Sequence, residues 1–159
     1  MSKPKNKWIK LFYSLVITLG TGAIAGLATA SSIGGWYASL AKPSFNPPNW
    51  IFGPTWTLLY ILMGIALYLV WKQSPSRHRY NAISFFFIQL LLNFCWSFIF
   101  FYFHEIGLAL ADIIVLWVFI VITIISFGKH HKTAAALLIP YLTWVSFATI
   151  LNVAIYRLN

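Results

Sequence analysis

Residues 36–60 read WYASLAKPSFNPPNWIFGPTWTLLY, and this stretch decides how the rest of the chain is interpreted. It contains three tryptophans and four prolines, and it lies between two apolar runs of membrane length. Proline fixes φ and removes a backbone donor, so the stretch cannot begin as a regular helix. Tryptophan and tyrosine favour the boundary between membrane and water. The stretch therefore predicts a rigid, aromatic-rich capping loop at 31–51, leading into a helix near Pro54.

The composition indicates a protein embedded in a lipid bilayer. Of the 159 residues, 60% are hydrophobic and 8% are charged, whereas about 25% are charged in an average soluble domain. Glu105 and Asp112 are the only acids. A soluble protein of this size could not cover its surface with so few charges, so we expect an integral membrane protein.

Five segments reach the roughly 20 apolar residues that a membrane-spanning helix needs. They are residues 9–30, 52–71, 80–103, 107–127 and 134–156. Charged and turn residues gather in the connections, and His104-Glu105 predicts a very tight turn between the third and fourth segments. No connection is long enough for a second domain. The sequence predicts an all-α bundle of five transmembrane helices, as a single domain over 1–159.

The basic residues predict the orientation of this bundle. Nine of them fall on one side, at Lys3, Lys5, Lys7, Lys10, Lys72, Arg77, Arg79, Lys129 and Lys132, and two on the other, at Lys42 and Arg157. Cytoplasmic loops carry the excess of Lys and Arg, so we expect a cytoplasmic N-terminus and an outer cap, in a bacterial cell membrane. This distribution is typical of membrane loops, and no nucleic-acid motif accompanies it.

The first segment has two interpretations. Its basic start, its apolar run and Ala28-Thr-Ala30 imitate a cleaved signal peptide. The run is nevertheless longer than the 7–15 residues of a signal-peptide core. It also contains Gly22 and Gly26, a small-residue pair suited to close helix packing. We therefore favour a retained helix.

Three segments each carry a face of aromatic and polar side chains at helical spacing. These faces are Trp56 and Tyr60; Gln89, Asn93, Trp96, Ser97 and Phe100; and Tyr141, Trp144, Ala148 and Asn152, with Pro140 expected to bend the last helix near its start. Together with the cap they could enclose a flat, apolar ligand. The alternative is that the amides only join helices through hydrogen bonds, which we favour for Gln89.

Catalytic and metal-binding signatures are thin. Asp112 lies inside a membrane segment, which is compatible with a proton relay, but a structural carboxylate satisfied by hydroxyl or indole groups is favoured because no second intramembrane acid accompanies it. His104-Glu105 lacks the helical HExxH spacing of a zinc hydrolase. His130-His131 sits between lysines in a turn, which favours a solvated loop. We expect no metal and no cofactor.

Several motifs resemble the translocator protein family, known in bacteria as tryptophan-rich sensory proteins (TspO/MBR). Residues 36–60 resemble the pattern W-Y-x-x-L-x-K-P-x-[FW]-x-P-P-x-W-x-x-G-P-x-W-x-x-L-Y of that family. Further similarities are LNFCWSFIFF at 92–101, GLALAD at 107–112 and PYLTWVSFATILN at 140–152. Together they cover most of residues 36–157 and leave the first helix unmatched.

The resemblance implies a homodimeric five-helix bundle that binds porphyrins such as protoporphyrin IX and benzodiazepine-type ligands beneath the first loop. The ligand-binding residues expected on this basis are Trp36, Pro47, Trp56, Tyr60, Asn93, Trp96, Phe100, Trp144 and Ala148. In some bacterial members, light-dependent porphyrin degradation is attributed to the tryptophans that match Trp56 and Trp144. These two would be the catalytic residues if degradation occurs.

Cholesterol, a ligand of animal members, is doubtful here. The recognition pattern needs a tyrosine where this chain has Val153, and Arg157 follows Tyr156 without the required intervening residue. The leading interpretation is a membrane receptor or sensor for tetrapyrroles and related apolar molecules, with surrounding lipid as its other partner. A porphyrin-degrading enzyme and a tetrapyrrole transporter are the alternatives.

Overall fold

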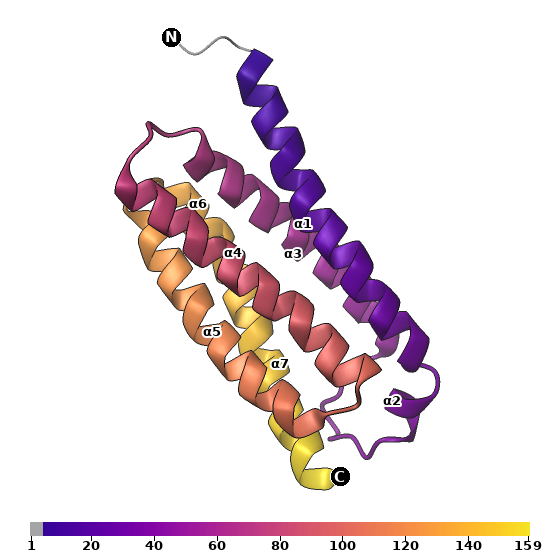
Figure 1. Ribbon diagram of the computed structural model, residues 1–159. Helices are drawn as coiled ribbons and strands as arrows, with labels where there is room; N and C mark the ends of the chain where they lie inside the picture. Colours follow the sequence, from indigo (N-terminus) through magenta and orange to yellow (C-terminus); the bar gives the residue numbers. More distant parts are fainter. Residues whose placement is uncertain (1–4) are drawn as a thin grey trace.

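A computed structural model describes residues 5–159, so Lys3, one of the charges used for the orientation, lies outside the described residues. Over that range the chain forms helices and no strand. The spans are α1 (Lys5–Ser32), α3 (Asn49–Trp71), α4 (Arg77–Ser97) continued by the π-helix η1 (Phe98–Tyr102), α5 (Ile106–Gly128), and α6 (Lys132–Leu137) continued by α7 (Ile139–Leu158). Five such units are long and apolar enough to cross a membrane. The predicted all-α, five-helix membrane architecture is confirmed (Figure 1).

The helices pack through three extensive pairs and two buried clusters. The most extensive pairs are α1 with α3, α4 with α5 and α5 with α7. One buried cluster, which includes Met63, Phe86 and Tyr141, joins α3, α4, α5 and α7. A second cluster gathers under the capping loop and includes Tyr37 and Phe100. Residues of both clusters border the cavity described below.

Two helix boundaries differ from the sequence expectation for local reasons. α4 begins at Arg77 because the Ser76 hydroxyl accepts a hydrogen bond from the Arg79 backbone N–H at 3.1 Å, a typical N-cap. α3 begins at Asn49 rather than near Pro54. Pro54 lies in the second turn of α3, where its missing N–H removes only one helical bond. The start of α3 therefore absorbs part of the expected loop.

The other two irregularities lie next to residues of the predicted site. The last turn of the third span is a π-helix, closed by the bond from the Phe103 N–H to the Phe98 carbonyl at 2.9 Å. The fifth span is interrupted at Leu138, two residues before Pro140, which fits the predicted effect of this proline on the helix start. Both positions are local breaks in long apolar helices.

The capping loop is held by hydrogen bonds to its own backbone and side chains. It contains one short helix, α2 (Trp36–Ser39). The Lys42 ammonium donates to the carbonyls of Tyr37 and Leu40, each at 2.8 Å. The Tyr37 hydroxyl donates to the Asn46 side chain at 2.8 Å. Burial raises the pKa of Tyr37, and the bond to Asn46 opposes this only in part.

The tight turn predicted at His104-Glu105 is present between η1 and α5. His104 has a φ of 61°, and it is the only non-glycine residue in the described chain with a positive φ. Its ring stacks on the Trp36 indole with centroids 4.1 Å apart and 17° between the planes. The Ser32 hydroxyl donates to the Phe101 carbonyl nearby. The end of α1, the cap and the turn are thereby joined.

Candidate ligand-binding cavity

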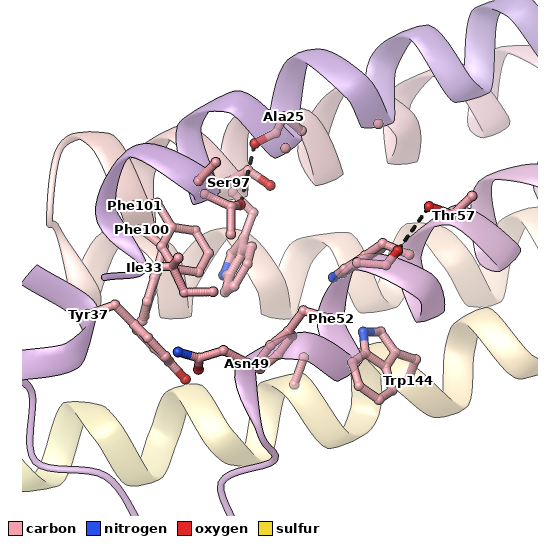
Figure 2. A pocket seen from close by; sticks show the side chains of 18 of the residues that line it. Ala25, Ile33, Tyr37, Asn49, Phe52, Thr57, Ser97, Phe100, Phe101 and Trp144 are labelled. Atoms are coloured by element: carbon pink, nitrogen blue, oxygen red, sulfur yellow. Dashed lines mark hydrogen bonds between the residues drawn. The ribbon is translucent and has the colours of Figure 1, made fainter. Parts of the chain in front are cut away.

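A cavity of about 610 Å³ lies beneath the capping loop. Its wall is formed by α1, α2, α3, α4, η1 and α7, together with Ile33, whereas no residue of α5 or α6 in the described chain lines it. Residues without charge make up the whole lining. Figure 2 shows the labelled side chains from these elements around the open space. The site is thus an apolar chamber at one end of the bundle.

Six of the nine residues predicted to bind ligand line this cavity. They are Trp56, Tyr60, Trp96, Phe100, Trp144 and Ala148. The rings of Trp56 and Tyr60, one turn apart on α3, have centroids 5.7 Å apart. Trp96 stacks on Phe100 at 5.1 Å with 18° between the planes. Aromatic faces from three helices therefore border one space, as the helical spacing predicted.

The other three predicted residues lie outside the lining. Trp36 stacks on His104 and contacts the edge of Phe100, with centroids 5.5 Å apart. Pro47 lies in the loop before α3. Asn93 is buried behind the wall. The chain therefore separates residues that line the cavity from residues that support its wall.

Asn93 belongs to a buried hydrogen-bond network that begins at the cavity wall. The Tyr60 hydroxyl donates to Asn93 Oδ1 at 2.5 Å, and Asn93 Nδ2 donates to the Tyr141 hydroxyl at 3.1 Å. The Tyr141 hydroxyl donates to Gln89 Oε1 at 2.8 Å, so Gln89 joins α4 to α7, as its structural interpretation predicted. Buried polar groups satisfied in this way fix the packing of their helices.

A second amide, Asn152, is also occupied by structural bonds. It accepts from the Trp96 indole N–H at 3.1 Å and donates to the Ile106 carbonyl at 3.2 Å. These bonds hold Trp96 in the wall and tie α7 to the start of α5. Within residues 5–159, the indole N–H groups of Trp56 and Trp144 donate no hydrogen bond. Two donors in the wall are therefore available to an occupant.

Sequence reasoning missed most of the wall that comes from α1. This wall includes Leu19, Gly22, Ala23, Ala25, Gly26, Thr29 and Ala30. The sequence predicts a close helix-packing face at Gly22 and Gly26. Gly22 does lie at the close contact between α1 and α3, and both glycines also line the cavity. A side chain at Gly22 would overlap the Tyr60 ring, whereas nothing lies within 4 Å of a Cβ at Gly26. The sequence signal that could have indicated this wall was the small-residue pair itself.

Phe52 was also missed, although it lies in the decisive stretch. Its ring meets the Trp144 ring edge to face, with centroids 6.1 Å apart. Figure 2 shows these two side chains adjacent on one side of the space, with Tyr37 and Asn49 at another. Phe52 was overlooked because the expected helix began near Pro54, which left its direction undefined.

Asp112 does not line the cavity. One of its carboxylate oxygens, Oδ2, is buried and has no hydrogen-bond partner in the described part of the chain. Satisfaction by hydroxyl or indole groups, which the sequence favoured, is therefore not seen for that oxygen. The structure gives Asp112 no role in the chamber.

Taken together, these features define a multi-pass membrane protein with an uncharged, aromatic chamber under a proline-rich cap. The model of the TspO/MBR family matches residues 13–157, and the chain belongs to this family. It is 46% identical to the tryptophan-rich protein TspO of Archaeoglobus fulgidus, over 95% of this chain and 97% of that protein.

Other relatives extend across bacteria and animals. The chain is 36% identical to the tryptophan-rich sensory protein of Cereibacter sphaeroides, over 94% of this chain and 91% of that protein. It is 39% identical to the human translocator protein, over 78% of this chain and 75% of that protein. The family resemblance carried by the sequence motifs is confirmed.

Proposed function

We propose that the protein is a membrane receptor or sensor that binds tetrapyrroles such as protoporphyrin IX, and benzodiazepine-type apolar ligands, in the chamber under the cap. The observation that carries this proposal is the lining itself. A cavity of about 610 Å³ bordered by aromatic rings and no charge falls within the 300–1,000 Å³ of typical small-molecule sites. The names of two relatives, sensory protein and translocator protein, support the same role.

The chemistry of the wall suits a flat, aromatic ligand. Trp56, Phe52 and Trp144 offer ring faces and edges, which favour offset stacking or edge contacts with a macrocycle. The indole N–H groups of Trp56 and Trp144 can donate to an acceptor on the ligand. Asn49, on the lining near the cap, offers an amide to the carboxylates of a porphyrin. A few polar groups in an apolar chamber fix the orientation of the ligand, while the apolar surface supplies most of the affinity.

Light-dependent porphyrin degradation is the second candidate function. It is favoured by the presence of both Trp56 and Trp144 in the lining of the cavity. Indole is the most easily oxidised of the aromatic groups there. Trp96 is a third tryptophan of the lining, but its indole N–H is bonded to Asn152, so Trp56 and Trp144 would be the reacting side chains. Binding alone requires only their ring surfaces. Phenylalanine at both positions should therefore preserve binding but not degradation.

One titration with protoporphyrin IX, in darkness and then under light, separates the candidates. In darkness, the Trp56→Phe/Trp144→Phe double variant should retain most of the affinity, because a ring remains at each position. A matched control is Trp8→Phe, since Trp8 is 74% exposed at the opposite end of α1. Affinities equal to that of a protein-free micelle, for wild type and control alike, would overturn the binding proposal.

Illumination of the same samples then tests whether the protein degrades porphyrin. If the wild type bleaches the porphyrin Soret band and the double variant does not, the tryptophans act in degradation. If both leave the band shifted but intact, the protein is a receptor only. Movement of porphyrin across proteoliposomes, without loss of the band, would instead support a transporter.

A further inference from the structure

The end of the bundle opposite the cap carries a basic surface that is not part of the cavity. We define the basic end surface as Lys7, Lys10, Lys72, Arg77, Lys129 and Lys132. These residues lie at the start of α1, at the connection from α3 to α4 and at the connection from α5 to α6. Figure 1 shows these segments together at one end and α2 with the C-terminus at the other.

No acid balances these charges. The only acids of the sequence, Glu105 and Asp112, lie before α5 and in its second turn, at the end of the bundle that carries the cap. Lys7, Lys72, Arg77, Lys129 and Lys132 are exposed, and Lys10 is partly buried. A surface with one sign of charge attracts counter-ions and raises their local concentration. The surface therefore lacks an anionic partner within the chain.

Lys10 of this surface and the adjacent Arg79 have neutral hydrogen-bond partners. The Lys10 ammonium donates to the Trp71 carbonyl at 3.3 Å. Arg79, only 5% exposed, donates to the same carbonyl at 3.2 Å and to that of Gln73 at 2.6 Å. Two cations from α1 and α4 thus converge on one carbonyl at the end of α3. An anion beside them would relieve their mutual repulsion.

Arg79 gives a second sign of an incomplete site. Its Nε is buried and has no hydrogen-bond partner among the described residues. Its guanidinium lies 4.8 Å from the centroid of the Tyr80 ring. A guanidinium presents its donors as a planar fork that matches the geometry of phosphate oxygens. The group therefore has unused capacity next to exposed lysines and Arg77.

Aromatic residues set the depth of this surface in the membrane. Trp8 is 74% exposed and Tyr80 is 57% exposed, each within two residues of a basic side chain. Trp and Tyr are enriched at the level of the lipid headgroups. Their presence indicates that the basic residues lie where lipid phosphates are, rather than in the aqueous phase.

We propose that the basic end surface binds the phosphate groups of anionic phospholipids of the surrounding membrane. The proposal is independent of the ligand in the chamber, because the two sites lie at opposite ends of the bundle. Basic clusters directly beside membrane helices are a recognised pattern for anionic lipid binding. The probe is dioleoylphosphatidylglycerol, and dioleoylphosphatidylcholine, which bears a phosphate but no net charge, is the comparison lipid.

The test measures lipid retained per protein and the midpoint of thermal unfolding in mixed micelles. Phosphatidylglycerol should be retained over phosphatidylcholine and should raise the midpoint, and salt should reduce both effects. Each charge near an anionic surface is worth about fivefold in binding. The Lys72→Gln/Arg77→Gln/Lys132→Gln variant should therefore lose at least about tenfold of the preference.

A matched pair of single variants controls for charge loss alone. Arg77→Gln should weaken retention of phosphatidylglycerol, whereas Arg157→Gln, an exposed arginine at the other end, should not. Equal retention of the two lipids, or equal effects of the two variants, would overturn the proposal. Inorganic phosphate, supplied at the headgroup concentration, must not reproduce the stabilisation. If it does, the surface binds a free anion and the lipid assignment is wrong.

Discussion

At the scale of single residues, the chamber depends on one close approach between α1 and α3. Gly22 leaves space for the Tyr60 ring, which lines the cavity and also donates to Asn93. The same ring therefore contributes to the wall and to the buried network. A larger residue at Gly22 cannot be accommodated without moving it.

We predict that Gly22→Ala displaces Tyr60 and lowers both stability and ligand affinity. The added methyl group would overpack the helix pair, at a cost of about 1–3 kcal/mol in the free energy of unfolding. Thermal unfolding in one detergent, followed by porphyrin titration, measures both effects. Gly20→Ala is the control, since nothing lies within 4 Å of its added Cβ and Gly20 does not line the cavity. Equal behaviour of the two variants would show that the Gly22 contact is unimportant.

A second residue-scale prediction concerns Tyr37 and pH. Burial raises the pKa of Tyr37 above its ordinary value of 10.0. A raised folded-state pKa means that the neutral hydroxyl stabilises the fold at lower pH, and that this stability is lost as pH rises through the raised pKa. The stability difference between wild type and Tyr37→Phe should be constant below about pH 9 and shrink above pH 10. A difference that does not change with alkaline pH would contradict this.

At the scale of elements, the cap is held in place by hydrogen bonds within the chain. Lys42 closes the end of α2, and Asn46 bonds to Tyr37. At the C-terminal end of the chain, Asn159 exchanges two hydrogen bonds of 3.0 Å with the backbone of Ala41. The loop is therefore joined to α7 as well as to itself. A preorganised loop loses less entropy when a ligand binds beneath it.

We predict that replacing both Pro47 and Pro48 with alanine weakens porphyrin binding by about 1 kcal/mol or more, because the unbound loop gains conformations that binding must freeze. Neither residue lines the cavity, so lost contact with ligand cannot be the cause. Binding is measured by titration, and circular dichroism checks that the helices remain. Unchanged affinity would mean that the prolines only anchor the loop at the interface.

Sequence patterns predicted some elements better than others. The five spans follow from apolar length, and the cap follows from prolines that cannot continue a helix. The π-helix at Phe98–Tyr102 has no such signal, because it reflects packing of η1 against α1 and α5. The role of Asn93 was missed for the same reason. An amide on the expected face can point into the cavity or toward a neighbouring helix, and only packing decides which.

At the scale of the whole molecule, the charged residues are distributed unevenly between the two ends of the bundle. Most basic residues of the described chain lie opposite the cap, with Lys42 and Arg157 as the exceptions, while both acids lie near it. Self-association into a homodimer stays a prediction. Gly22 and Gly26, the small-residue pair on which this prediction rests, line the cavity.

We predict that the N-terminus lies in the cytoplasm and the cap and C-terminus lie outside in a bacterial host. Nine basic residues against two set this orientation. Reporter fusions at both termini, active on only one side of the membrane, measure it. A cytoplasmic signal from a C-terminal fusion would contradict the orientation or the number of spans.

The central claim, that the chamber under the cap holds the ligand, is tested most directly by filling the chamber. Ala148 lines it from α7, one turn beyond Trp144. Ala148→Phe should occupy part of the space and lower protoporphyrin IX affinity by at least about tenfold, equivalent to 1.4 kcal/mol, with the midpoint of thermal unfolding unchanged or raised. A well-folded Ala148→Phe protein that binds protoporphyrin IX as tightly as wild type would contradict the account.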